Sequence, residues 1–129
     1  MVSLIFNKAK KIKDKEALRS VVRISYINYP KNKKLKYLFI EGARELIKLG
    51  DTWWIQNIWH RNNSLLDDVT KTEADILLKG LMLMKDIEYH GEEILGPITL
   101  KFPEKIITFF LDRVKEKGNK KYSLDDRYT

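Results

Sequence analysis

The sequence predicts an all-α fold, a compact bundle of about five helices formed by a single domain over residues 1–129. Apolar residues recur at steps of three and four positions through most of the chain, as they do on the buried face of a helix. Alternation typical of a strand is confined to one short stretch near 94–102. Because no apolar run approaches the roughly 18 residues that cross a bilayer, we expect no membrane partner.

Two absences in the composition exclude whole classes of chemistry. The chain has no cysteine, which rules out disulfides, thiolate metal sites and a cysteine nucleophile. His60 and His90 lie 30 positions apart with no ligand at metal-binding spacing, and no glycine-rich phosphate loop is present. We therefore expect no catalytic residue, no metal and no cofactor. Because lysines begin at Lys8, after an apolar stretch too short for a secretory signal, we expect a cytoplasmic protein.

The first two helices are predicted from caps and apolar stripes. Asp14 is a suitable N-cap for a helix that runs to about Ile27. Pro30 suits the first turn of a second helix that ends at Gly50, where a glycine commonly terminates a helix. The outer face of this second helix has two pairs of opposite charge at three-residue spacing, Glu41 with Arg44 and Glu45 with Lys48.

Three further elements follow in the middle of the chain. Asp51 can cap a short third helix that contains Trp53, Trp54 and Trp59, before a polar break at 60–64. Thr70 and Glu73 have the spacing of a capping box, which predicts a fourth helix from there to Ile87, ending near Gly91. That helix is apolar nearly all round and is expected to pack at the centre of the core.

The C-terminal part is predicted to contain one connecting segment and one helix. Gly96, Pro97 and an alternation at Ile98, Leu100 and Phe102 indicate a short extended segment near 94–102. Pro103 then starts a last helix, which Gly118 is expected to close. The polar tail at 119–129 is a candidate for flexibility.

Positive charge is concentrated at the N-terminal end of the chain. Residues 1–36 contain eleven lysines and arginines against two acids, whereas residues 37–129 contain fourteen against sixteen. The segment 1–13 is basic, with four lysines and no acid. Such an asymmetric distribution is typical of proteins whose partners carry phosphate or are acidic proteins. A surface that serves only solubility is the alternative.

A cluster of lysines near the start of the second helix predicts an anion site. Lys31, Lys33, Lys34 and Lys36 crowd its expected first turns, where the helix dipole is already positive and a cation is disfavoured. An anion would compensate, and backbone N–H groups at a helix start suit phosphate. Asn28 and Tyr29, just upstream, together with Tyr26, are candidates for contact with a base or sugar. We therefore predict a nucleotide-binding site at residues 28–34, with an ordinary basic loop as the alternative.

The tryptophan-rich segment is the second candidate region. Trp53, Trp54 and Trp59 are more simply explained as core or interface residues than as platforms for bases. The polar residues that follow, Arg61 and Asn62, are the ones most suited to face a ligand. The candidates for nucleic-acid binding are Lys36, Trp59, His60 and Arg61.

The stretch from Lys34 to Gly42, with Gly50 and Trp59 beyond it, resembles part of the C-terminal domain of primase large subunits. There a basic cluster precedes a helix of the Tyr-x-x-Phe-Leu-Lys type. The chain lacks the cysteines of that domain's iron–sulfur cluster. It is therefore more similar to the PriX family, the cysteine-free noncatalytic accessory subunits of certain archaeal primases. The matching region covers about a fifth of the chain.

The resemblance implies a noncatalytic subunit that promotes primer initiation. Its partners would be the primase catalytic and large subunits, the initiating nucleotide triphosphate, template DNA and primer. Lys31, Lys33 and Lys34 would then hold the triphosphate, with Arg61 on template phosphate. Asn28, Tyr29 and Pro30 stand where the family has other residues, including a histidine and an arginine. The two alternatives are a stand-alone DNA-binding protein, such as one of viral origin, and a structural assembly subunit.

Overall fold

The computed structural model describes residues 2–12, 14–58, 64–87 and 89–124 and confirms the all-α class. The described part contains six α-helices and two short 3-10 helices, and no strand. In chain order the elements are α1 (Val2–Ile12), α2 (Lys15–Asn28), α3 (Leu35–Lys48), η1 (Trp53–Asn57), η2 (Leu65–Asp68), α4 (Lys71–Met82), α5 (Tyr89–Lys101) and α6 (Pro103–Leu124).

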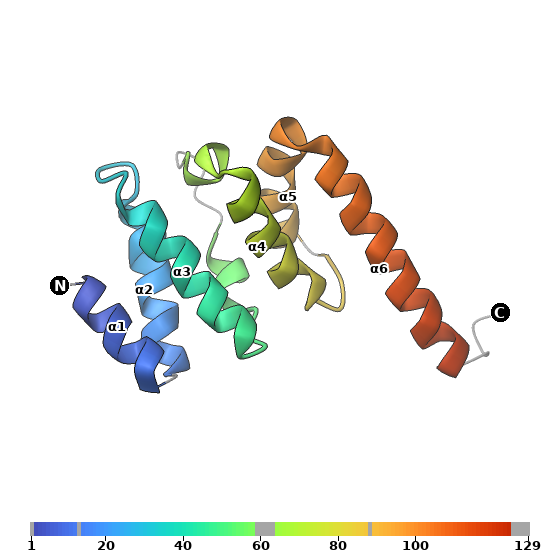
Figure 1. Cartoon of the computed structure of the whole chain (residues 1–129), viewed down its shortest axis with the longest axis horizontal. Coiled ribbons are helices and arrows are strands. Elements are labelled where there is room, and N and C mark those ends of the chain that lie inside the picture. The colour runs from blue at the N-terminus through green and yellow to red at the C-terminus, as the bar shows by residue number, and fades with distance from the viewer. Residues whose placement is uncertain (1, 13, 59–63, 88, 125–129) are drawn as a thin grey trace.

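The helices follow one another across the molecule from one end to the other (Figure 1). α1, α2 and α3 form the N-terminal end, α4 and α5 lie in the middle, and α6 forms the opposite edge. A continuous apolar core joins these parts, and its largest fully buried side chains include Phe39, Trp54 and Leu77. Phe6 is buried in the same core and holds α1 in place, so the basic N-terminal segment is a packed helix.

Local signals for α2, α3 and α4 are confirmed. Asp14 accepts a hydrogen bond from the Ala17 N–H at 3.1 Å and caps α2. Thr70 and Glu73 form both hydrogen bonds of the capping box at the start of α4. The two charge pairs on the outer face of α3 also form, with N–O distances of 3.5 and 3.3 Å.

Two element boundaries differ from the prediction in this half of the chain. α3 begins at Leu35 rather than at Pro30, because residues 29–34 form turns in which Asn32 N–H donates to the carbonyls of Asn28 and Tyr29. The expected third helix is one 3-10 helix, η1. Its N-cap is Thr52 rather than the expected Asp51, although Asp51, one residue earlier, accepts from Trp53 N–H at 2.8 Å.

The extended segment expected near 94–102 is wrong, because this region belongs to α5. Ile94, Leu95 and Ile98 are all buried, which is helical spacing. Leu100, which an alternating strand would place on the same side as Ile98, is 86% exposed. Pro97 lies inside the helix, where it has no N–H to donate and its ring crowds the carbonyl of the preceding turn.

The ends of α4 and α6 also differ from expectation. α4 ends at Met82 instead of continuing to Ile87, and the side chain of Arg113 hydrogen-bonds to backbone carbonyls at and beyond that end. α6 continues past Gly118 to Leu124, so residues 119–124 of the expected tail are helical. A single glycine inside a helix costs only about 1 kcal/mol relative to alanine, too little to end it.

Candidate nucleic-acid interface

The basic turn, residues 31–34, joins α2 to α3 with all four residues exposed. Its backbone is closed by internal hydrogen bonds. Lys31 N–H donates to Asn28 O at 3.1 Å, and Lys34 N–H donates to the side-chain oxygen of Asn32, also at 3.1 Å. The turn is therefore a defined structure that presents lysine side chains to solvent.

The backbone amides at the start of α3 are already used. Besides Lys34 N–H, which the Asn32 side chain takes, Leu35 N–H donates to Asn32 O and Lys36 N–H donates to Lys33 O. The N–H groups that were expected to bind phosphate at this helix start therefore already donate to acceptors within the chain. A phosphate at this position would contact side chains.

Two of the four lysines hold the fold together. Lys36 Nζ donates to Asp68 O at 3.0 Å and forms an ion pair with Glu73 at 3.1 Å. Lys33 Nζ lies 3.2 Å from Ser64 Oγ and 4.5 Å from the centre of the Tyr29 ring. Both side chains reach across to the segment around η2.

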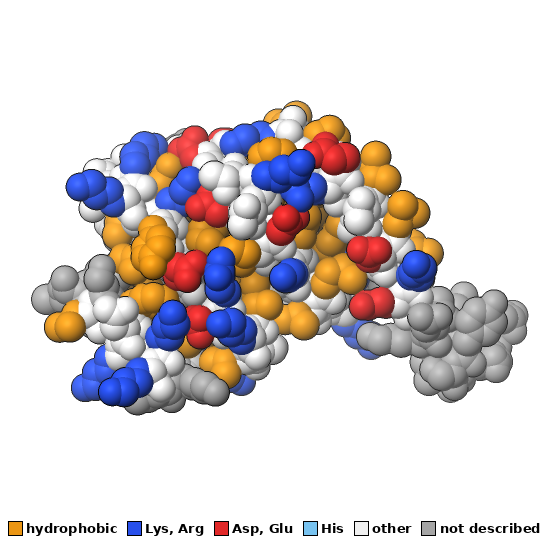
Figure 2. Space-filling model, viewed as in Figure 1, with side chains coloured by type: hydrophobic (Ala, Val, Ile, Leu, Met, Phe, Trp, Pro, Cys, Tyr) orange, Lys and Arg blue, Asp and Glu red, His pale blue; other side chains and the backbone are white. Residues whose placement is uncertain are grey.

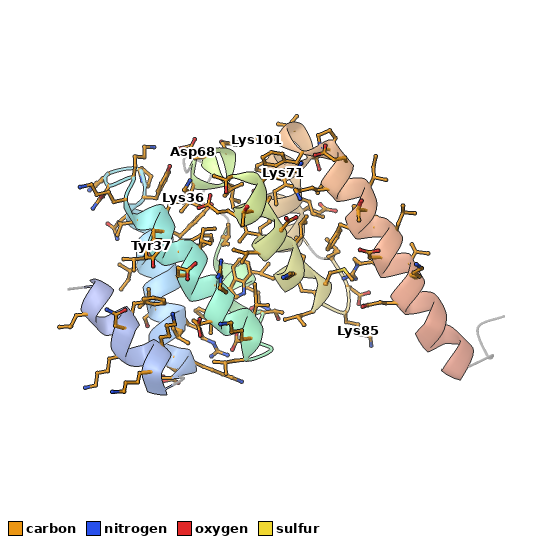
Figure 3. The ribbon with its side chains drawn as sticks, viewed as in Figure 1. Lys36, Tyr37, Asp68, Lys71, Lys85 and Lys101 are labelled. Atoms are coloured by element: carbon orange, nitrogen blue, oxygen red, sulfur yellow. The ribbon has the colours of Figure 1, made fainter. Side chains whose placement is uncertain are left out.

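A third lysine binds the same segment from the other side. Lys101, at the end of α5, donates to the carbonyls of Asp67 and Val69 at 2.9 and 2.8 Å. Figure 3 shows Lys36, Asp68 and Lys101 near one another along the upper edge of the molecule. These lysines neutralise the carbonyl end of η2, where cations are stabilising.

The two tyrosines proposed to contact a base are buried. Tyr26 and Tyr29 are each 3% exposed. The Tyr29 hydroxyl donates to the Asp68 carboxylate, and burial together with this hydrogen bond raises the pKa of Tyr29 to about 12. Burial, with nearby Glu93 and Asp67, raises the pKa of Tyr26 to about 12. Neither ring presents a face to a ligand.

The side chain of Asn28 also has a hydrogen-bond partner within the fold. Its side-chain nitrogen donates to Ile24 O at 2.9 Å, one turn back in α2. Of the residues predicted to bind a nucleotide, the structure brings Tyr29 and Lys33 together, with Lys33 Nζ 4.5 Å from the ring centre. Asn28, Tyr29 and Lys33 each have a hydrogen-bond partner within the protein.

Lys31, Lys34 and Tyr37 remain available for a ligand. Within the described residues, the side chains of Lys31 and Lys34 form no hydrogen bond or ion pair. Tyr37, one turn into α3, is 65% exposed and is the aromatic side chain that the sequence prediction missed. Its position opposite the buried stripe of α3 was the signal that could have identified it.

Further exposed cations lie on α1 and α2. They share high exposure and a position in the first 36 residues: Lys8, Lys10, Lys11, Lys15 and Arg23. Figure 2 shows lysine and arginine side chains at this end of the molecule. Arg19 differs, because it pairs with the buried Asp51 and lies 5.3 Å from the Trp53 ring.

The other candidate region is only partly described. Trp59, His60 and Arg61, with Asn62, lie outside the described residues. Trp54 is fully buried and packs edge-on against Phe39, with ring centres 6.1 Å apart. Trp54 is therefore a core residue, which is the simpler of the two readings given to the tryptophans.

Comparisons with protein-family models, curated proteins and solved structures give no match for this chain. Among the described residues, no group of three or more histidine, aspartate or glutamate side chains is placed to hold a metal ion. The same part of the chain has no helix long and apolar enough to cross a membrane.

Proposed function

We propose that this chain is a noncatalytic nucleic-acid-binding protein that uses the basic turn and the exposed lysines of α1 and α2 to hold phosphates. The observation that carries the proposal is the exposure of Lys31 and Lys34 beside Tyr37. Lysine ammonium groups bind phosphate as point charges, and an exposed aromatic ring can stack on an unpaired base. This combination favours single-stranded nucleic acid.

The electrostatics of the surface support the same assignment. The only acids in residues 1–36 are Asp14 and Glu16, and Asp14 is occupied as the cap of α2. Exposed cations attract a polyanion and release its counterions, so affinity should fall steeply with salt. Lys33 and Lys36 contribute to the positive potential but are held by contacts with the fold.

More specifically, we propose that this chain is an accessory subunit of a DNA primase complex. The resemblance between residues 34–42 and the primase large-subunit domain, and to the PriX family, supports this form. Lys31 and Lys34 would contact the triphosphate of the initiating nucleotide or the template, and the catalytic and large subunits would be the partners. Tethering of a nucleotide-binding domain raises the effective concentration of the first nucleotide, so no catalytic residue is needed.

A binding titration with matched variants tests the general proposal. Labelled single-stranded DNA, duplex DNA and a nucleoside triphosphate are titrated at about 50 and 200 mM salt, a range over which phosphate contacts weaken strongly. Lys34→Glu should reduce affinity for single-stranded DNA at least fivefold. Lys85→Glu makes the same change in charge just beyond the C-terminal end of α4, at the lower edge of the molecule (Figure 3), and should change affinity less than twofold. Equal effects of the two variants would reject the basic turn as the site.

The primase form has its own test. Purified catalytic and large subunits of a primase are mixed with the full chain, and primer initiation is measured with and without it. Complex formation and faster initiation that depend on Lys31 and Lys34 support this form. DNA binding without complex formation supports the stand-alone DNA-binding alternative.

A further inference from the structure

Helix α6 carries a second apolar stripe that faces away from the core. Phe109 and Arg113 are buried against the rest of the protein. A different set of apolar residues on the helix is exposed, with exposed fractions of 44–68%: Ile107, Phe110, Leu111 and Val114. Their spacing of three, four and seven positions places them on one side of the helix.

This stripe is continuous and accessible. Figure 2 shows hydrophobic side chains along the outer edge of α6, and in Figure 1 no other described helix lies beyond that edge. A small cavity of about 350 Å³, lined by Phe110, Val114 and Ile87 among others, adjoins the stripe. Contiguous exposed apolar surface of this kind marks an interaction site more often than chance exposure does.

The charges at the edge of the stripe indicate which partner fits. Glu104 and Lys115, both exposed, lie 11 positions apart, and 100° per residue places both along the same edge of the stripe. When two copies of a helix pair antiparallel about a two-fold axis, the same edges face each other. With the axis between Phe110 and Leu111, Glu104 of one copy comes within about 3 Å, along the helix axis, of Lys115 of the other.

We propose that the outer face of α6 binds a second copy of this chain through antiparallel α6–α6 packing. Ile107 of one copy faces Val114 of the other, and Phe110 faces Leu111, so every apolar residue of the stripe meets an apolar partner. The two Glu104–Lys115 pairs flank this contact symmetrically. A contact between two such surfaces is isologous, the arrangement in which the same patch serves both subunits.

The packing of α6 onto its own protein supports this arrangement. Arg113 donates to the carbonyls of Leu81, Met84 and Lys85 at 3.0–3.1 Å, which holds the helix in one orientation. The stripe therefore lies on a helix whose position is already fixed, so dimerisation does not have to order α6. The dimer surface lies at the end of the molecule opposite the basic turn (Figure 1), so a dimer exposes two basic surfaces.

Cysteine cross-linking tests the geometry directly, because the natural chain has no cysteine. Ile107→Cys and Val114→Cys variants are mixed in full-length form and oxidised under mild conditions. The mixture should form disulfide-linked dimers at least fivefold faster than either variant alone. The reason is that the two copies of position 107 lie about 10 Å apart along the axis in the antiparallel pair. Equal cross-linking of Ile107→Cys alone would indicate a parallel pair and overturn the proposal.

Sedimentation equilibrium tests the energetic part with exposed residues whose replacement leaves the core intact. Leu111→Glu should raise the dimer dissociation constant at least tenfold without loss of helicity. Glu104→Lys should raise it roughly fivefold, and the double variant Glu104→Lys with Lys115→Glu should restore it. A natural chain that stays monomeric to about 1 mM, or a double variant no better than Glu104→Lys, would overturn the proposal.

Discussion

The ammonium group of Lys36 lies 3.1 Å from the carboxylate of Glu73, so an ion pair joins the first turn of α3 to the first turn of α4. Glu73 at the same time accepts from Thr70 N–H in the capping box of α4. Both side chains are mostly buried, with 24% and 20% exposed. A lysine that the sequence placed in a ligand site thus stabilises the contact between two helices.

This difference between Lys36 and its neighbour Lys34 is testable with matched variants. Lys36→Met keeps the aliphatic stem but removes the ion pair and the hydrogen bond to Asp68 O, and should lower the free energy of unfolding by about 1 to 2 kcal/mol. Lys34→Met should change stability by less than about 0.5 kcal/mol. In titrations with single-stranded DNA, the larger loss should come from Lys34→Met. Urea unfolding and the DNA titration on both variants provide the check, and a reversed ranking would contradict the assignment.

Tyr37 should contribute stacking without contributing to the fold. Because it is 65% exposed, Tyr37→Ala should leave the unfolding midpoint nearly unchanged. Base–aromatic stacking is worth about 1 to 3 kcal/mol, so affinity for single-stranded DNA should fall by about five- to a hundredfold. Tyr37→Phe should retain most of the affinity, since the ring alone stacks. Fluorescence anisotropy with a labelled oligonucleotide measures both variants, and unchanged binding by Tyr37→Ala would remove Tyr37 from the interface.

The buried tyrosines make stability sensitive to alkaline pH. The pKa of Tyr29 is about 12 in the folded protein, against about 10 in an unfolded chain, and Tyr26 is raised equally. The folded state therefore favours the protonated phenol. The stabilisation that results from this preference is complete below pH 10 and is lost as the pH rises from 10 to 12.

The comparison of Tyr29→Phe with the natural chain isolates this effect from lysine titration. The variant should be less stable at pH 8, because it loses the hydrogen bond to Asp68, but its stability should fall less steeply between pH 10 and 12. Urea midpoints across this range, with tyrosinate absorbance recorded in parallel, supply the measurement. If stability falls equally steeply between pH 10 and 12 in both proteins, the pKa of Tyr29 is not raised in the folded state.

Arg113 should be essential for the attachment of α6. It is 7% exposed and donates to three carbonyls at and beyond the end of α4. Arg113→Met leaves those carbonyls without this donor and should cost about 2 to 4 kcal/mol of unfolding free energy. Arg113→Lys should recover part of the loss. Thermal unfolding at low protein concentration measures both, with Lys79→Met as an exposed control, and a loss no greater than in the control would contradict this role.

The sequence by itself determined the helical class, the N-caps of α2 and α4, and the ion pairs on the outer face of α3. All of these depend on residues three or four positions apart, whose relative positions a helix defines before any tertiary contact forms. The wrong prediction of an extended segment at 94–102 also came from residues close together in the sequence. Ile98, Leu100 and Phe102 alternate as in a strand, whereas Ile94, Ile98 and Phe102 have the four-residue spacing of a helix. The burial of Ile94 and Ile98 and the exposure of Leu100 identified the helix.

The tertiary structure alone decided which cations remain available to a ligand. Lys33, Lys36 and Lys101 meet partners 31 to 34 positions away around η2, and Tyr29 meets Asp68 across 39 positions. A local pattern contains no information about such distant acceptors, so all the lysines near α3 appeared equivalent in the sequence. Lys31, Lys34 and Tyr37 became distinct from the others only when the packing of α3 against η2 and α4 had satisfied their neighbours.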